Sequence, residues 1–204
     1  MGSEAGNDAV SAREPRPTAL IDAASANMER MLGYVFWHWP SPGCDRRAYE
    51  EELAAFHKTL ADEPPGGFLR SGAFRPSRLP FAGAGSPEVV YEDWYVVEGW
   101  HALGELNAAA VSGSREPAHA RVAARSAGGA GAVYALVRGL GALEHATCAA
   151  WFAEPREPPQ GADVWQRQMV LGPAPEFCIV CARGVDLPYY DRENVVERAL
   201  VTIS

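Results

Sequence analysis

Two short aromatic segments far apart in the chain have the same pattern, and this repeat limits the possible folds more than any other feature. They occupy residues 34–40 and 148–155, and each has two adjacent aromatic residues three and four positions before a proline: Phe36-Trp37 before Pro40, and Trp151-Phe152 before Pro155. A second cue recurs in the same order, because Pro-Glu opens an apolar segment at residue 87 and again at residue 175. Two cues repeated in one order predict a chain of two related halves.

Composition and charge exclude several classes of partner. The chain has 204 residues and a net charge of −8, and Lys58 is its only lysine. A phosphate-binding surface needs clustered cations, so we expect no nucleic-acid partner. No apolar stretch approaches the ~20 residues of a membrane helix, so we expect no membrane partner. Four cysteines do not make a disulfide scaffold in a chain of this length, and we expect a reduced, cytoplasmic protein.

Residues 1–31 are expected to be a flexible tail with a possible short helix at residues 18–31. Residues 32–140 then read as strand, helix, strand, strand, helix and strand. Asp45 is a suitable N-cap for the first helix, whose apolar residues have a period of 3.6. The other segments expected in this half are strands at 33–39, 68–74, 89–97 and 132–137, helices at 98–111 and 114–126, and a helix end and turn at the glycine-rich residues 128–131.

Residues 141–204 read almost entirely as strands. Alternating and β-branched residues predict strands at 145–153, 165–171, 177–182 and 195–203. About nine residues separate Pro155 from Val164, which is too few for a matching helix between the first of these strands and the second. We therefore expect a second half that keeps its strands and has lost most of its helices.

The element order of the first half is that of a ferredoxin-like unit. Two such units in one chain resemble the dimeric α/β-barrel superfamily, over residues 33–203. The resemblance implies an α+β fold of two ferredoxin-like halves that form an internal α/β barrel. It also implies small-molecule chemistry in or beside the barrel, as in the superfamily's monooxygenases and isomerases. A barrel built within one chain needs no dimer, although a homodimer remains possible.

Strand alternation sorts the aromatic residues into two sets of candidate ligand contacts. In the first strand Tyr34, Phe36 and His38 share a face, and in the strand at 89–97 Tyr91, Asp93 and Tyr95 share a face. Tyrosine hydroxyls and a carboxylate on aromatic walls suit a small hydrophobic ligand with a few polar groups.

Roles for these residues follow from their chemistry. His38 would be the catalytic acid/base because imidazole titrates near neutral pH, and Asp93 would orient it or act as a second base. Tyr91 and Tyr95 would donate hydrogen bonds to a developing oxyanion, and Tyr34 and Phe36 would help to bind the substrate. The alternative is a packed core in which the same histidine and hydroxyls are hydrogen-bonded internally.

No metal site is expected. Cys178 and Cys181 are three residues apart on a strand and so point to opposite faces. Glu98 and His101 share a helix face, but a carboxylate-bridged metal pair needs a second such motif. Haem remains possible by the resemblance, since haem-binding members use a proximal histidine, for which His119 or His145 is available.

The sequence thus favours a small-molecule enzyme without a tightly bound cofactor. Its substrate would be apolar, either aromatic or polyketide-like, and its reaction a monooxygenation, an isomerisation or a cyclisation. One alternative is a non-catalytic binding or accessory protein, and another is a haem-dependent enzyme.

Overall fold

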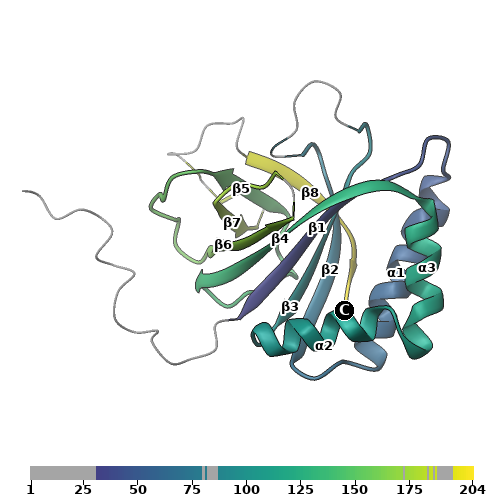
Figure 1. The fold of residues 1–204 in the computed structure, drawn as a ribbon. Helices are drawn as coiled ribbons and strands as arrows, with labels where there is room; N and C mark the ends of the chain where they lie inside the picture. Colours follow the sequence, from purple (N-terminus) through teal and green to yellow (C-terminus); the bar gives the residue numbers. More distant parts are fainter. Residues whose placement is uncertain are drawn as a thin grey trace, which may run out of the picture.

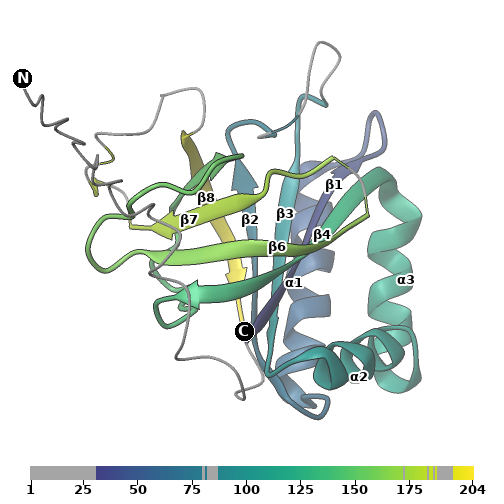
Figure 2. The same cartoon turned by 60° about the vertical axis from the view of Figure 1, so that its left-hand side comes forward.

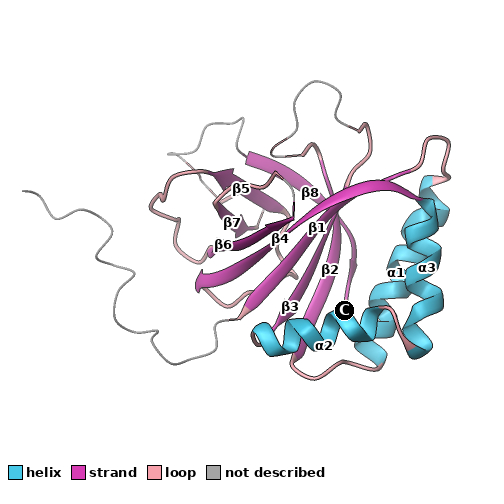
Figure 3. Ribbon diagram, viewed as in Figure 1, coloured by secondary structure: helices cyan, strands magenta, loops and turns pink. Residues whose placement is uncertain are grey.

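Eight strands form one closed antiparallel barrel, with helices on part of its outer surface (Figures 1 and 3). The computed structural model describes residues 31–79, 81, 87–171, 173–182, 184–185, 187 and 195–204. The tail and short helix expected within residues 1–31 lie almost wholly outside these residues. Among the described residues, no helix is long and apolar enough to cross a membrane.

The elements alternate in the first part of the chain and are all strands in the second. The strands are β1 (Leu32–Pro40), β2 (Phe68–Pro76), β3 (Tyr91–Val97), β4 (Ser126–Arg138), β5 (Cys148–Phe152), β6 (Asp163–Leu171), β7 (Phe177–Cys181) and β8 (Val195–Ile203). The helices are α1 (Arg46–Asp62), α2 (Trp100–Ala110) and α3 (Glu116–Arg125), with a single 3₁₀ turn (Gly113–Arg115) before α3.

Helix α1 forms where its sequence pattern predicts it. The carboxylate of Asp45 accepts a hydrogen bond of 2.7 Å from the amide of Ala48, which caps the first turn. The residues that α1 buries recur at helical spacing and form one stripe facing the barrel wall: Tyr49, Leu53, Phe56, His57 and Leu60. That stripe includes a histidine, which becomes important at the candidate site.

The three helices lie against the outer face of β1 to β4. Figures 1 and 2 show α1 and α3 side by side along this face, with α2 across one end. A buried apolar cluster fills the space between sheet and helices, including Phe56 from α1, Tyr95 from β3 and Val133 from β4. Residues 32–138 thus have the β-α-β-β-α-β order that the sequence predicts, with the second helical segment divided into α2 and α3.

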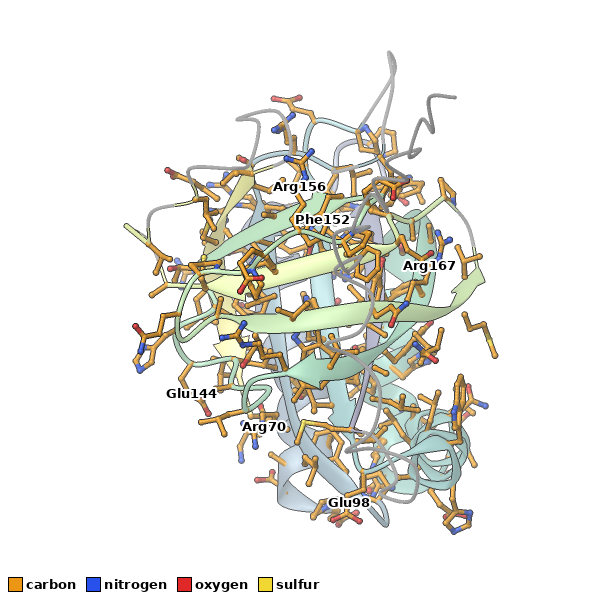
Figure 4. The ribbon with its side chains drawn as sticks, turned by 90° about the vertical axis from the view of Figure 1, so that its left-hand side faces the viewer. Arg70, Glu98, Glu144, Phe152, Arg156 and Arg167 are labelled. Atoms are coloured by element: carbon orange, nitrogen blue, oxygen red, sulfur yellow. The ribbon has the colours of Figure 1, made fainter. Side chains whose placement is uncertain are left out.

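The outer face of β5 to β7 has no helix over it among the described residues. In Figure 4 these strands face the viewer with no helix in front of them, with the labelled Phe152 and Arg156 near one rim and Glu98 at the opposite end. A separate apolar cluster lies on this face, including Ala150, Phe152 and Ile179. The loop residue Ala162 belongs to this cluster, and the loop residue Leu187 packs against it. These loops therefore cover part of the cluster, as the helices cover the sheet on the other side of the barrel.

The two sets of four strands follow one order around the barrel. Read in one direction, the strands are β4, β1, β3, β2 and then β8, β5, β7, β6, so each set has the order fourth, first, third, second. Pairing of β2 with β8 and of β4 with β6 closes the barrel within a single chain. The expected boundary after residue 140 falls in the connection between β4 and β5.

Aligning the two aromatic segments on their prolines matches residues whose side chains point in opposite directions. Trp37 and Trp151 both point into the barrel, where their rings lie 5.2 Å apart, whereas Phe36 is on the helix-covered face. Alignment on the prolines would match Trp151 with Phe36, which points the opposite way. A shift of one residue exchanges the two faces of a strand, so in side-chain direction it is Trp37 that agrees with Trp151.

The expected helix end and turn at residues 128–131 is wrong, because this glycine-rich segment belongs to β4. Gly128 pairs with Trp39 and Gly129 with His38 of β1. A Cβ atom at Gly129 would lie 2.5 Å from the ring of Phe36, and one at Gly128 would lie 2.8 Å from the ring of Trp39. Glycine is needed here because the aromatic side chains of β1 lie across the strand, which is a recurrent reason for glycine inside a sheet.

The barrel interior is filled by side chains. Trp37, Trp94, Trp151, Trp165 and Tyr134 are all buried there. Interior Glu92 accepts hydrogen bonds from the indole nitrogens of Trp37 (2.8 Å) and Trp94 (2.7 Å), and it pairs with Arg198 of β8 at 2.5 Å. A barrel packed in this way leaves the helix-covered side as the place for a ligand.

Candidate active site

Strand alternation places the polar residues of the candidate site between the sheet and the helices. His38 on β1 and Asp93 on β3 come from neighbouring strands, because Phe36 pairs with Asp93 and His38 with Tyr91. Both side chains are on the face that carries α1 and α3, while the adjacent Trp37, Glu92 and Trp94 point into the barrel. The face shared by His38, Asp93 and Tyr95 thus meets the helices.

Asp93 is the centre of a buried polar cluster. Its Oδ2 atom lies 3.2 Å from His38 Nε2 and 3.6 Å from Nε2 of His57, which comes from α1. The hydroxyl of Tyr95 donates a hydrogen bond of 3.0 Å to the same oxygen. Asp93 is 3 % exposed, so one buried carboxylate oxygen is surrounded by two imidazoles and a phenol.

Each imidazole has a second partner at Nδ1. His38 Nδ1 lies 2.6 Å from the hydroxyl of Tyr49, and His57 Nδ1 lies 2.7 Å from Oγ of Ser71. These contacts hold the planes of both rings, as partners of the second nitrogen do in other sites that use histidine. The rings also stack, His57 on Tyr95 at 5.1 Å and His38 on Phe36 at 5.5 Å.

One polar atom of this cluster, Asp93 Oδ1, is buried and has no hydrogen-bond partner. Nε2 of His38 and of His57 both face Asp93 Oδ2, at 3.2 and 3.6 Å. A buried polar atom without a partner costs free energy, so such atoms are uncommon in a core that only supports the fold. Asp93 Oδ1 thus departs from the internally satisfied core considered from the sequence, whereas both imidazoles and the hydroxyl of Tyr95 have internal partners.

Opposing effects set the charge of Asp93. Burial alone would raise the pKa of its carboxyl group, but the charges and hydrogen bonding of His38 and His57 together hold that pKa well below its usual range. Burial, and next the charge of Asp93, raise the pKa of Tyr95 well above its usual value. The site therefore presents a carboxylate that remains ionised next to a phenol that remains protonated.

The pKa of Asp93 has a consequence for stability. Because its folded-state pKa is below the unfolded value of about 4, the ionised carboxylate stabilises the fold above pH ~4, and this contribution is lost as pH falls from there towards the folded pKa. We expect the urea midpoint of the wild type to fall more steeply than that of Asp93→Asn over this acid range. Parallel curves for the two proteins between pH ~2 and ~5 would contradict the assignment.

A cavity of about 440 Å³ adjoins the cluster, a size typical of small-molecule sites. Its walls come from β1, β3, the first residues of β4, α1 and α3, and are mainly aromatic and aliphatic, including Phe36, Tyr49, Leu53, Phe56 and Val122. His38 and Asp93 provide polar groups on one side. The small residues 126–129 of β4 form another wall, where the absence of bulky side chains leaves space.

Not all of the predicted residues reach this cavity. His38, Phe36, Asp93 and Tyr95 line it. Tyr34 is not part of the lining and stacks on Phe36 and Tyr95, with ring centres 6.2 and 6.0 Å away. Tyr91 is also outside the lining, and its hydroxyl donates a hydrogen bond of 3.0 Å to Glu50.

Sequence reasoning missed Tyr49, His57 and Ser71. Tyr49 and His57 belong to the buried stripe of α1, where their spacing identifies the helix but does not identify the polar partners they meet. A histidine in an otherwise apolar stripe was the available signal, since a buried imidazole requires a partner. Ser71 gave no signal in the sequence.

The remaining histidines and cysteines lie in different environments. His119 of α3 lines the cavity and packs its ring edge-on against Phe56 at 5.4 Å, whereas His145 is exposed in the β4–β5 connection. Cys178 points into the barrel and Cys181 points outward opposite Cys148, as alternation predicts. In the part of the chain that the structure describes, no group of three or more His, Cys, Asp and Glu side chains is arranged to hold a metal ion.

No protein-family model matches the chain, and no curated protein matches it. Among solved structures, the fold is similar to the crystal structure of an anthrone oxidase-like protein, with a TM-score of 0.50. The alignment covers 86 % of this chain and 93 % of that chain at 9 % sequence identity. At this identity the likeness concerns the fold alone.

Proposed function

We propose that the protein is a small-molecule enzyme that removes a proton from an apolar aromatic or polyketide-like substrate at the His38–Asp93 pair. The observation that carries this proposal is the buried carboxylate of Asp93, which shares one oxygen among His38, His57 and Tyr95 and leaves the other without a partner beside an aromatic cavity. Strongly perturbed carboxyl groups with specific partners in a cavity are characteristic of functional sites.

The residues of the cluster have different roles in the proposed reaction. Neutral His38 takes the proton, Asp93 stabilises the imidazolium that forms, and the bond of His38 to Tyr49 keeps the imidazole oriented. Tyr95 holds the carboxylate in place, because its hydroxyl already donates to Asp93 and is not free for a substrate oxyanion. The aromatic walls orient the flat ring system, which supplies much of the rate in such sites.

Proton removal is a first step common to oxygenation, isomerisation and cyclisation. The likeness to an anthrone oxidase-like protein supports oxygenation as the reaction to test first. An anthrone is a carbon acid, and loss of a proton from its ring CH₂, or from the hydroxyl of its enol form, gives one enolate. Transfer of electrons from this enolate to O₂ converts the CH₂ group to C=O and releases one water, so that O₂ is the only co-reactant.

The test is an assay with anthrone in air-saturated buffer. We expect consumption of one O₂ for each anthraquinone formed, at a rate proportional to enzyme concentration. Neither O₂ uptake nor anthraquinone above the uncatalysed rate would contradict oxygenation of this substrate. Absence of deuterium exchange from the ring CH₂ into solvent would in addition contradict proton removal itself.

The lining of the cavity favours chemistry without a tightly bound cofactor. Haem would need an axial ligand and cations for its propionates. His119 is available as a ligand, but among the described residues no Arg or Lys lines the cavity, and Arg125 of α3 pairs with Glu52 at 2.9 Å. These residues fit haem poorly, and a protein purified from haem-supplied cells should show no Soret band.

A non-catalytic binding protein would use the same cavity. In that case substitutions at His38 and Asp93 would change ligand affinity, and no product would form with the wild type. The unpartnered Asp93 Oδ1 favours the catalytic alternative, since a purely apolar cavity would hold a ligand without that cost.

We also infer that the two sets of four strands arose by duplication of one ferredoxin-like unit. The shared order of β4, β1, β3, β2 and β8, β5, β7, β6 supports this origin, with loss of the helices from the second set. The site lies on the helix-bearing set, where helices provide the wall opposite the sheet.

A further inference from the structure

We propose that the cavity selects aromatic ligands carrying a neutral hydroxyl group and rejects aromatic carboxylates and phosphates. This inference rests on the proposed function in that it names the substrate class of the same site. The inference concerns which ligands the cavity binds, so binding measurements test it without any turnover.

The first argument concerns charge. Asp93 is an ionised carboxylate at the cavity wall. No Arg or Lys lines the cavity within the described residues. Arg125 forms an ion pair with Glu52 of α1, and Arg75 forms an ion pair with Glu50 at 2.6 Å. An anionic ligand would therefore lie near the buried carboxylate of Asp93 without an arginine or lysine to offset its charge, and like charges repel strongly beside a buried group.

The second argument concerns hydrogen bonding. Asp93 Oδ2 already has Tyr95 as a donor and the two imidazoles nearby, whereas Oδ1 is buried without a partner. An ionised carboxylate oxygen only accepts hydrogen bonds. A ligand that completes this site must supply a donor, and a phenolic or enolic hydroxyl does so without adding charge.

The third argument concerns shape. Phe36 and Phe56 provide flat apolar surfaces on opposite sides of the cavity, one from β1 and the other from α1. Residues 126–129 add a wall of small residues, where a side chain in place of Gly129 would collide with Phe36. Aromatic rings fit such surfaces well, so the ligand combines a planar ring system with one hydroxyl directed at Asp93.

The test measures equilibrium binding of 1-naphthol, naphthalene and 1-naphthoate by isothermal titration calorimetry or tryptophan fluorescence. The three share one skeleton and differ in the group offered to Asp93. We expect 1-naphthol to bind at least about tenfold more tightly than naphthalene, the range for a hydrogen bond to a charged group. We expect 1-naphthoate to bind more weakly than naphthalene.

Substitution of Asp93 provides the matched comparison. Asp93→Asn removes the negative charge, so 1-naphthoate should gain at least about tenfold in affinity while 1-naphthol loses affinity. Asp163→Asn is the control, because Asp163 is a buried aspartate outside the cavity whose Oδ1 accepts a hydrogen bond from Leu140 N. This control should leave all three affinities unchanged.

The outcomes separate this inference from the proposed function. Equal or tighter binding of 1-naphthoate than of 1-naphthol by the wild type would overturn the inference, whether or not the protein turns over anthrone. If the ligands bind in the predicted order but no substrate is turned over, the inference about recognition stands and the proposed catalytic function is refuted. The wild-type ligand series does not depend on the folding of any variant.

Discussion

Asp93→Asn and His38→Ala are each expected to reduce turnover at least about a hundredfold, because loss of a positioned acid or base typically costs 10²–10⁴ in rate. Asp93→Asn keeps the size of the side chain but removes the charge that the two imidazoles and Tyr95 surround. His38→Ala removes the imidazole that joins Asp93 to Tyr49. Steady-state rates with anthrone, combined with circular dichroism of each variant, measure the effect on a folded protein.

Two substitutions control for nonspecific effects. Asp163→Asn makes the same chemical change at another buried aspartate, and His145→Ala removes an exposed histidine from the β4–β5 connection. Both should retain wild-type turnover. Full activity in folded Asp93→Asn and His38→Ala would remove these residues from the mechanism, and equal losses in the controls would indicate that the assay reports stability.

Arg198→Met is expected to lower the free energy of unfolding by about 3–5 kcal/mol, because it leaves the buried carboxylate of Glu92 without its cation. Glu92 is fully buried and Arg198 is 1 % exposed, and their side chains meet at 2.5 Å inside the barrel. The guanidinium group also lies 4.3 Å above the ring of Phe74, so its loss removes packing as well as charge. Urea unfolding monitored by tryptophan fluorescence measures the change.

The double variant Glu92→Gln with Arg198→Met separates pairing from packing. Glu92 accepts from the indoles of Trp37 and Trp94 with different oxygens, whereas glutamine carries no charge and keeps one acceptor oxygen. The double variant should therefore recover part of the stability lost in Arg198→Met. A single variant as stable as the wild type would show that Glu92 is not held as a buried anion. A double variant no better than the single would assign the loss to packing around Phe74.

The alternation of side-chain direction along the strands predicted more of the structure than any other feature of the sequence. It placed His38, Asp93 and Tyr95 on one face and Trp37 and Trp94 on the other, because side-chain direction in a strand depends on position alone. The same rule put Cys178 and Cys181 on opposite sides of β7. Bounds of the later strands were also predictable, since β-branched and aromatic residues cluster there.

Properties that depend on contacts between distant segments were not predictable in this way. His57 meets Asp93 only because α1 packs over β3, and Glu92 meets Arg198 only because the barrel closes between β2 and β8. Residues 128–131 suggested a turn because glycine usually marks one, whereas here the bulky rings of β1 require glycine in a strand. Tyr91 lies on the expected face, but a bond to Glu50 of α1 directs its hydroxyl elsewhere.

A crystal structure of the protein with bound 1-naphthol tests most directly whether the site lies between the sheet and α1 and α3. We predict ring density between Phe36 and Phe56 and a hydroxyl oxygen within hydrogen-bond distance, about 2.5–3.0 Å, of Asp93 Oδ1. A ligand bound among the tryptophans inside the barrel, or one in the cavity with its hydroxyl directed away from Asp93, would contradict the account.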